Sequence, residues 1–163
     1  MADEPLHCRV EIPKGSRNQY AFDPELGGIK LARFLFSSVV YPTDYGFVPD
    51  TLSPKGEPLD AMIAVQEPTF PGCMIGVRTI GVLRTSDDEG QDDKLLCVPC
   101  DDPGWAGMHG LADVPERMRI EIEHFFSIYK EPEGRAVTIH GWEDAQVAEQ
   151  LLQEARDRFR AAA

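Results

Sequence analysis

The sequence has little positive charge: 16 Lys and Arg residues stand against 28 Asp and Glu residues, for a formal net charge of −12. A nucleic-acid-binding protein uses a basic surface to displace counterions from phosphates, and this chain has no basic stripe. We therefore expect no nucleic-acid partner, and a barrel that binds single strands is disfavoured. The same charge favours a protein that gathers cations.

Long apolar runs and targeting signals are absent as well. No apolar run approaches the roughly 20 residues that span a bilayer. The N-terminal stretch MADEPLH lacks the basic and apolar regions of a signal peptide. We therefore expect no membrane partner and a cytoplasmic location. The length of 163 residues fits a single domain, residues 1–163, around one core.

Cysteine is scarce, with four residues in the chain, and only Cys97 and Cys100 form a C-x-x-C pair. A structural zinc site of this type needs a second pair, which the sequence lacks. The pair also ends an expected strand, with no helix start beside it to activate a thiol. We expect reduced cysteines without a redox or metal role.

Hydrophobic periodicity predicts strands in the first part of the chain and helices in the second. Strands are expected at residues 8–12, 61–65, 74–84, 94–99 and 135–141. One helix is expected from an N-cap at Asp113 to Pro132, and another from Asp144 onward. This order predicts an α+β fold, in which a small curved β-barrel carries two helices.

Two acidic stretches stand out against this outline. Residues 85–94, TSDDEGQDDK, place five carboxylates within seven residues, and residues 41–62 carry four more acids among prolines and glycines. Taken alone, such runs are usually solvated turns. However, Asp60 immediately precedes one expected strand and Asp92 closely precedes another. If those strands are neighbours, the two loops face each other and can bind hard cations through oxygen ligands.

Basic and phenolic side chains lie among these acids. Cations, Lys or Arg donors and Tyr hydroxyls together can hold a compact polyanion such as a phosphate. Each residue also has an ordinary structural role open to it, such as core packing for a tyrosine or capping of a helix for a lysine. The candidates are Arg33, Tyr41, Tyr45, Lys94, Tyr129 and Lys130.

Along nearly its whole length the chain resembles the soluble, magnesium-dependent family I inorganic pyrophosphatases of bacteria. The matching stretches include VEIPKGSRNQY, GGIKLARFLFSSVVYPTDYGFVPDTL, GEPLDAMIAV and DVPERMRIEIEHFFSIYK. The spacing of Asp87, Asp92 and Lys94, with Tyr129-Lys130 downstream, is specific to that family. The resemblance implies an OB-like five-stranded β-barrel with flanking α-helices, a hexamer, and hydrolysis of pyrophosphate to two phosphates. It also implies several Mg²⁺ ions per site, with Mn²⁺ or Zn²⁺ as substitutes.

The resemblance assigns roles to individual residues. It implies metal ligands at Asp60, Asp87 and Asp92, and further acids of the cavity at Glu11 and Asp88. It implies phosphate binding by Arg33, Tyr45, Lys94, Tyr129 and Lys130. Catalytic roles fall on Glu57, Asp60, Arg33 and Tyr45.

The chain departs from the family pattern at functional positions. Gln19 stands where relatives carry Lys, Ala21 where they carry Glu, Lys55 where they carry a metal-binding Asp, and Glu57 where they carry the Asp thought to activate water. An ammonium about 4 Å from a unit charge interacts by roughly 4 kcal/mol at an effective dielectric of 20, and a dication doubles that. Lys55 therefore either swings outward or grips phosphate and displaces a metal.

Two hypotheses stay open. One is a working pyrophosphatase with altered or reduced activity. The other is a weak or inactive relative of the same fold that binds metal or phosphate or has a binding or assembly role.

Overall fold

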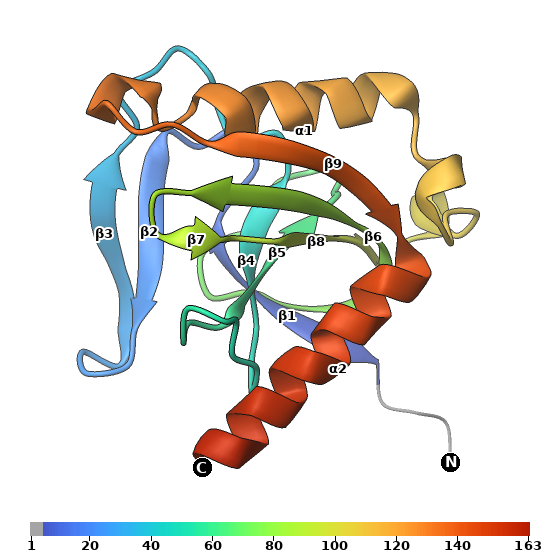
Figure 1. Ribbon diagram of the computed structural model, residues 1–163. Helices are drawn as coiled ribbons and strands as arrows, with labels where there is room; N and C mark the ends of the chain where they lie inside the picture. The colour runs from blue at the N-terminus through green and yellow to red at the C-terminus, as the bar shows by residue number, and fades with distance from the viewer. Residues whose placement is uncertain (1–4) are drawn as a thin grey trace.

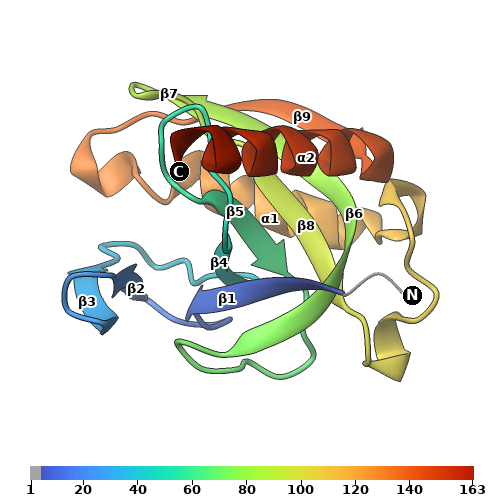
Figure 2. The ribbon, with the colours of Figure 1, turned by 90° about the horizontal axis from the view of Figure 1, so that it is seen from below.

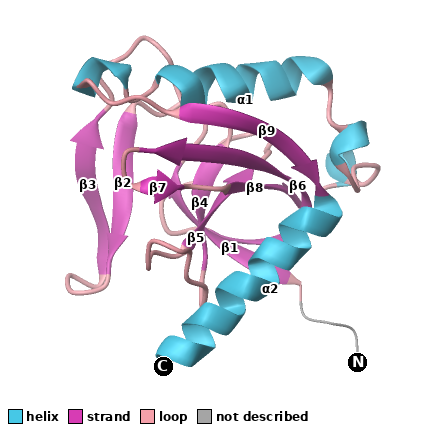
Figure 3. Cartoon of the chain, viewed as in Figure 1, coloured by secondary structure: helices cyan, strands magenta, loops and turns pink. Residues whose placement is uncertain are grey.

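Five strands close into a ring, and the other elements are arranged around it (Figures 1 and 3). The computed structural model describes residues 5–163, so most of the N-terminal stretch MADEPLH lies outside the described residues. Around the ring the order is β1 (Leu6–Ile12), β4 (Asp44–Val48), β5 (Leu59–Ile63), β8 (Lys94–Pro99) and β6 (Met74–Asp87), which pairs again with β1. The remaining elements are the hairpin of β2 (Asn18–Asp23) and β3 (Gly28–Phe34), β7 (Gly90–Gln91), β9 (Thr138–Asp144), α1 (Glu116–Ile128), α2 (Ala145–Ala162) and the short 3₁₀ helices Pro103–Trp105, Leu111–Asp113 and Glu131–Glu133. This arrangement confirms the predicted OB-like barrel with flanking helices.

The ring closes because β6 is long enough to pair with β1, β8 and β9 in turn. A register shift between Thr79 and Gly81 bends the strand, as a bulge does. Closure also needs a close approach at Gly46 of β4, where a Cβ atom would lie 1.9 Å from the carbonyl oxygen of Arg9 in β1. Only glycine fits at this position. The neighbouring Tyr45 lies in the same strand of the barrel wall.

Strands β5 and β8 run parallel beside each other (Figure 2). Their register places Asp60 opposite Lys94. The acidic stretch 41–62 ends within β5, where Asp60 is the second residue and does not precede the strand as expected, and the stretch 85–94 ends at the first residue of β8. The expectation that neighbouring strands bring the two loops together is therefore confirmed. The candidate site forms at this end of the ring.

Both faces of the central strands are buried, so their side chains alternate between two hydrophobic clusters. One cluster joins Ala61, Ile63 and Leu95 to α2. The other joins Met62 and Leu96 to α1. From α2 the first cluster receives Ala148, Leu152 and Ala155, and from α1 the second receives Ile122, Phe125, Phe126 and Tyr129. These helical faces are the apolar ones that the periodicity predicts, except that Phe159 near the end of α2 is exposed.

The element boundaries differ from the expectation at several places. Asp113 is not the N-cap of α1; its carboxylate instead accepts the backbone N–H groups of His109 and Gly110. Val114 is extended, because a residue before proline avoids the helical region. Pro115 is extended as well, and the helix begins at Glu116. Asp144 does cap α2, accepting the N–H of Ala145 at 2.7 Å. The periodicity did not predict the hairpin of β2 and β3.

All four cysteines are free, in agreement with the prediction. Cys97 lies in β8 and is fully buried, and Cys100 follows the end of that strand. Among residues 5–163, no helix is both long and apolar enough to cross a membrane.

Candidate active site

The ammonium group of Lys94 is the centre of the site. Its side chain is 1% exposed, yet it reaches Asp92 Oδ2 at 3.0 Å, the Tyr45 hydroxyl at 3.0 Å and Asp60 Oδ2 at 3.5 Å. The rings of Tyr45 and Phe126 also face the ammonium, with centroids at 5.4 and 5.1 Å. Burial alone would lower the pKa of Lys94, but the nearby Tyr129, Asp60 and Asp92 outweigh it and hold the pKa well above its usual value. Lys94 is therefore a permanent buried cation.

Asp60 and Asp92 share this cation and differ in acidity. Loss of solvation raises the pKa of Asp60 to about 6, with Lys94 opposing the shift and the negative charge of Asp92 adding to it. Loss of solvation also acts on Asp92, but the charge and hydrogen bond of Lys94, together with the charge of Lys55, outweigh it and hold the pKa of Asp92 below its usual value. Both carboxylates remain partly accessible, with side chains 28% and 21% exposed. Two such close acids favour an additional positive charge between them.

Two glutamates extend the acidic side of the site. Burial raises the pKa of Glu11 to about 7, opposed by the backbone N–H of Phe22, which it accepts at 2.8 Å, and increased further by the charges of Asp60 and Glu57. Glu57 itself is exposed in the loop before β5. We call Glu11, Glu57, Asp60 and Asp92 the acidic half of the site. Of these four, Asp60 and Asp92 contact the ammonium of Lys94, and Glu11 is close enough to Asp60 and Glu57 to feel their charges.

Asp87, at the end of β6, lies in contrasting surroundings. Its side chain is only 2% exposed, and it accepts Lys55 Nζ at 3.1 Å on Oδ1 and Lys130 Nζ at 2.9 Å on Oδ2. Arg135 Nη2 lies 3.6 Å from Oδ2. Although burial opposes its ionisation, the hydrogen bonds from Lys130 and Lys55 hold the pKa of Asp87 well below its usual value. We call Lys55, Lys130 and Arg135 the basic half of the site.

The other predicted residues lie farther out or in the core. Arg33 on β3 is half-exposed and pairs with Glu133, just beyond Lys130 in the chain. Tyr129 is buried in the α1 cluster, and its ring stacks on Phe125. Asp88 is exposed and accepts Arg135 at 2.9 Å.

The remaining departures from the family pattern lie on β2. Gln19 donates to the Tyr41 hydroxyl at 3.0 Å. Ala21, paired with Lys30 in the hairpin, brings no polar group. Neither position supplies the charged side chain that the family resemblance leads us to expect there.

Two contributors were missed by sequence reasoning. Arg135 bridges the acidic loop and the segment after α1, contacting Asp87, Asp88 and Glu89. Its signal in the sequence is a basic residue five positions after Lys130, next to the turn glycine Gly134. Phe126, which faces the Lys94 ammonium, is indistinguishable in sequence from any apolar residue of the α1 stripe.

A divalent cation fits the acidic half but not the basic half. Mg²⁺ keeps several waters and is usually bound through one or two carboxylates plus substrate phosphates, which suits Asp60 and Asp92. Within residues 5–163, no three Asp, Glu, His or Cys side chains are arranged to hold a metal ion as they stand. Asp87, in particular, already carries two ammonium groups. The assignment of Asp87 as a metal ligand stays a prediction.

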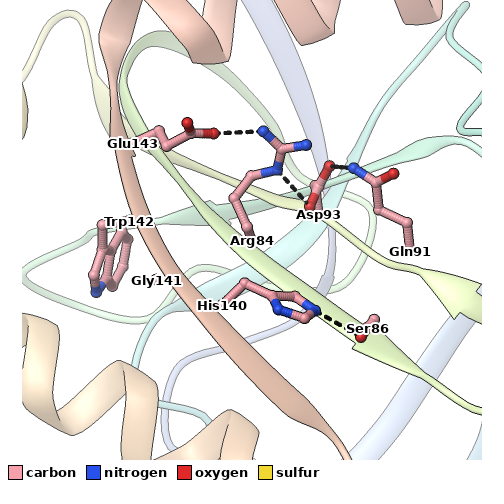
Figure 4. A pocket seen from close by; sticks show the side chains of 8 residues that line it. All are labelled: Arg84, Ser86, Gln91, Asp93, His140, Gly141, Trp142 and Glu143. Atoms are coloured by element: carbon pink, nitrogen blue, oxygen red, sulfur yellow. Dashed lines mark hydrogen bonds and ion pairs between the residues drawn. The ribbon is translucent and has the colours of Figure 1, made fainter.

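A separate surface hollow is lined by the C-terminal part of β6, by its partner strand β9 and by residues at and after β7 (Figure 4). There the Arg84 guanidinium pairs with Asp93 and Glu143, and His140 Nε2 lies 2.7 Å from the Ser86 hydroxyl. These charged groups are paired with one another. None of the residues that line this hollow belongs to the acidic or basic half of the site.

Comparison with known proteins shows the family to which the chain belongs. The family model described as inorganic pyrophosphatase matches residues 8–160. The inorganic pyrophosphatase of Methanosarcina mazei is 48% identical over 160 residues, which cover 98% of this chain and 95% of that protein. That of Streptomyces coelicolor is 49% identical over 152 residues, 93% of each. The crystal structure of the inorganic pyrophosphatase from Thermus thermophilus superposes with a TM-score of 0.93 at 38% identity, covering 98% of this chain and 93% of that one. The chain therefore belongs to the inorganic pyrophosphatase family.

Proposed function

We propose that this protein hydrolyses inorganic pyrophosphate to two phosphates with Mg²⁺ as cofactor. The observation that carries the proposal is the buried Lys94 ammonium held by Asp60, Asp92 and Tyr45 beside a second cluster of cations. Acids that attract a cation and bases that attract a phosphate thus meet at one end of the barrel. Pyrophosphate is highly charged, and both kinds of group are needed to hold it and to stabilise the leaving phosphate.

Each half has its part in the proposed reaction. Asp60 and Asp92 hold Mg²⁺, which, when bound, neutralises phosphoryl oxygens and lowers the pKa of a water. Lys94 and Tyr45 orient one phosphoryl group, and Lys130, Tyr129 and Arg33 bind the other. Glu57, at the exposed rim beside Glu11, accepts the proton of the attacking water.

The second candidate is a protein of the same fold that binds metal or phosphate without turnover. The four departures motivate it, but their side chains belong to neither hydrophobic cluster. They therefore change the charge of the site without disturbing its frame. All of Asp60, Asp92, Tyr45 and Lys94, to which the family resemblance assigns metal and phosphate binding, are present, and this favours catalysis.

With Mg²⁺ present, we expect the protein to convert the ³¹P NMR resonance of pyrophosphate into that of orthophosphate. Addition of EDTA is expected to stop the conversion, because the acidic half alone leaves the substrate charge unscreened. An Asp92→Asn variant serves as the matched control and should be impaired at the same Mg²⁺ concentration. Binding of pyrophosphate without its conversion, at high protein concentration, would support the non-catalytic candidate.

We further expect a homo-oligomer, a hexamer of 18.2 kDa subunits. The expectation follows from family membership and from the intact barrel and helices. Large apolar side chains such as Phe36 (71% exposed) and Leu31 (59%) give β3 and its surroundings a surface that association can bury. Light scattering at micromolar concentration tests it, and a purely monomeric mass would contradict it.

A further inference from the structure

The carboxylate of Asp87 accepts three hydrogen bonds from the protein, and a further cation lies just beyond hydrogen-bond distance. An ionised carboxylate offers about four lone-pair sites, two on each oxygen. Oδ1 accepts Lys55 Nζ at 3.1 Å and the backbone N–H of Glu89 at 2.9 Å. Oδ2 accepts Lys130 Nζ at 2.9 Å and faces Arg135 Nη2 at 3.6 Å. A metal ion can reach Asp87 only by expelling one of these donors.

Lys55 is held in this position by its own loop. The Lys55 N–H donates to Ser53 Oγ at 3.3 Å, and Ser53 in turn exchanges backbone hydrogen bonds with Gly56 and Glu57 at 2.9 and 2.6 Å. Gly56 has a φ of 83°, the left-handed conformation that closes such a turn. The Lys55 side chain is 14% exposed, so its ammonium points into the protein and not into solvent.

From this geometry we propose that Lys55 is a tethered cation that takes the place of a divalent metal ion at Asp87. This inference rests on the proposed function and specifies how many divalent cations its active site binds. Divalent cations then bind in the acidic half alone. Lys55 and Lys130 together outweigh the single charge of Asp87, so this part of the site is positively charged without a metal ion. Lys55 thereby lowers the number of divalent cations that the site binds.

Counting bound Mn²⁺ without pyrophosphate tests the proposal, because free Mn²⁺ has an EPR signal that bound Mn²⁺ loses. In the otherwise unchanged protein, Asp87→Asn should leave the number of Mn²⁺ ions per chain unaltered, whereas Asp92→Asn should reduce it. Lys55→Met, which keeps the stem and removes the charge, should bind one Mn²⁺ more per chain. Adding Asp87→Asn to Lys55→Met should abolish that gain. Lys55→Arg and the surface variant Lys30→Met should bind the same number of Mn²⁺ ions per chain as the unaltered protein.

Two results would overturn the proposal: loss of a Mn²⁺ ion on Asp87→Asn alone, or no gain on Lys55→Met. Circular dichroism verifies the fold of each variant, and Lys55→Gln replaces Lys55→Met if the latter does not fold. Since no pyrophosphate is present, the number of Mn²⁺ ions bound per chain is independent of catalysis. A protein that fails to hydrolyse pyrophosphate can still show the Lys55 effect, and an active one can lack it.

Discussion

Lys94→Met is expected to lower kcat for pyrophosphate by about 10²–10³-fold, the cost of removing one preorganised donor from a charge-stabilising site. The ammonium contacts Asp60, Asp92 and Tyr45 together. Its loss leaves two close carboxylates without their shared partner and removes a donor for a phosphoryl oxygen. Steady-state phosphate release at saturating Mg²⁺ measures the effect.

The same variant is expected to lose stability. Breaking a fully buried ion pair costs about 3–5 kcal/mol, and here about 2 kcal/mol is expected, because both carboxylates are partly exposed. Urea unfolding measures this loss. Lys30→Met, at a half-exposed lysine on β3, is the matched control and should retain activity. Near-normal turnover by a folded Lys94→Met protein would remove Lys94 from the proposed mechanism.

Lys55→Asp is expected to lower the Mg²⁺ concentration for half-maximal activity and to raise turnover. It removes the ammonium that occupies Asp87 Oδ1 and adds a carboxylate at the same loop position. Changes to the partners of metal ligands commonly alter affinity or activity by ~10–100-fold, and a gain of that order is expected here. Magnesium titrations of phosphate release for the two proteins measure both quantities.

Ala21→Glu should add to this gain, since Ala21 lies on the hairpin next to Phe22, whose N–H binds Glu11. The control is Lys55→Arg, which keeps the positive charge and should not lower the Mg²⁺ requirement. If Lys55→Asp instead abolishes activity, Lys55 serves as a phosphate ligand. The expectation that Lys55 limits activity by weakening Mg²⁺ binding would then be wrong.

The parts of the fold that follow from local pattern were predictable. The strand at residues 94–99 and the capping of α2 by Asp144 agree with the structure, because alternation and a side-chain cap are written in adjacent residues. The start of α1 was misplaced, since the proline constraint at Pro115 outweighs the capping tendency of Asp113. Strand β4 was hidden inside the acidic stretch 41–62, where prolines and glycines obscure its alternation.

The sequence could propose which residues form the candidate site, but not how their side chains pair. Asp60 and Asp92 were proposed as acids of the site from their position at the starts of expected strands and from the family resemblance, and the structure places Asp60 within β5 and Asp92 two residues before β8. The direction taken by Lys55 was left open, because a four-carbon stem can reach either solvent or the cavity. Tertiary packing decides it: Asp87 at the end of β6 is within reach of the loop before β5 and of Lys130 after α1.

The release of phosphate from pyrophosphate by the unaltered protein, measured across a magnesium titration, tests the proposed function most directly. We expect no release without Mg²⁺, a rise with metal concentration, and saturation once the acidic half is filled. Absence of phosphate above the no-protein control, at high protein concentration and up to tens of millimolar Mg²⁺, would contradict it.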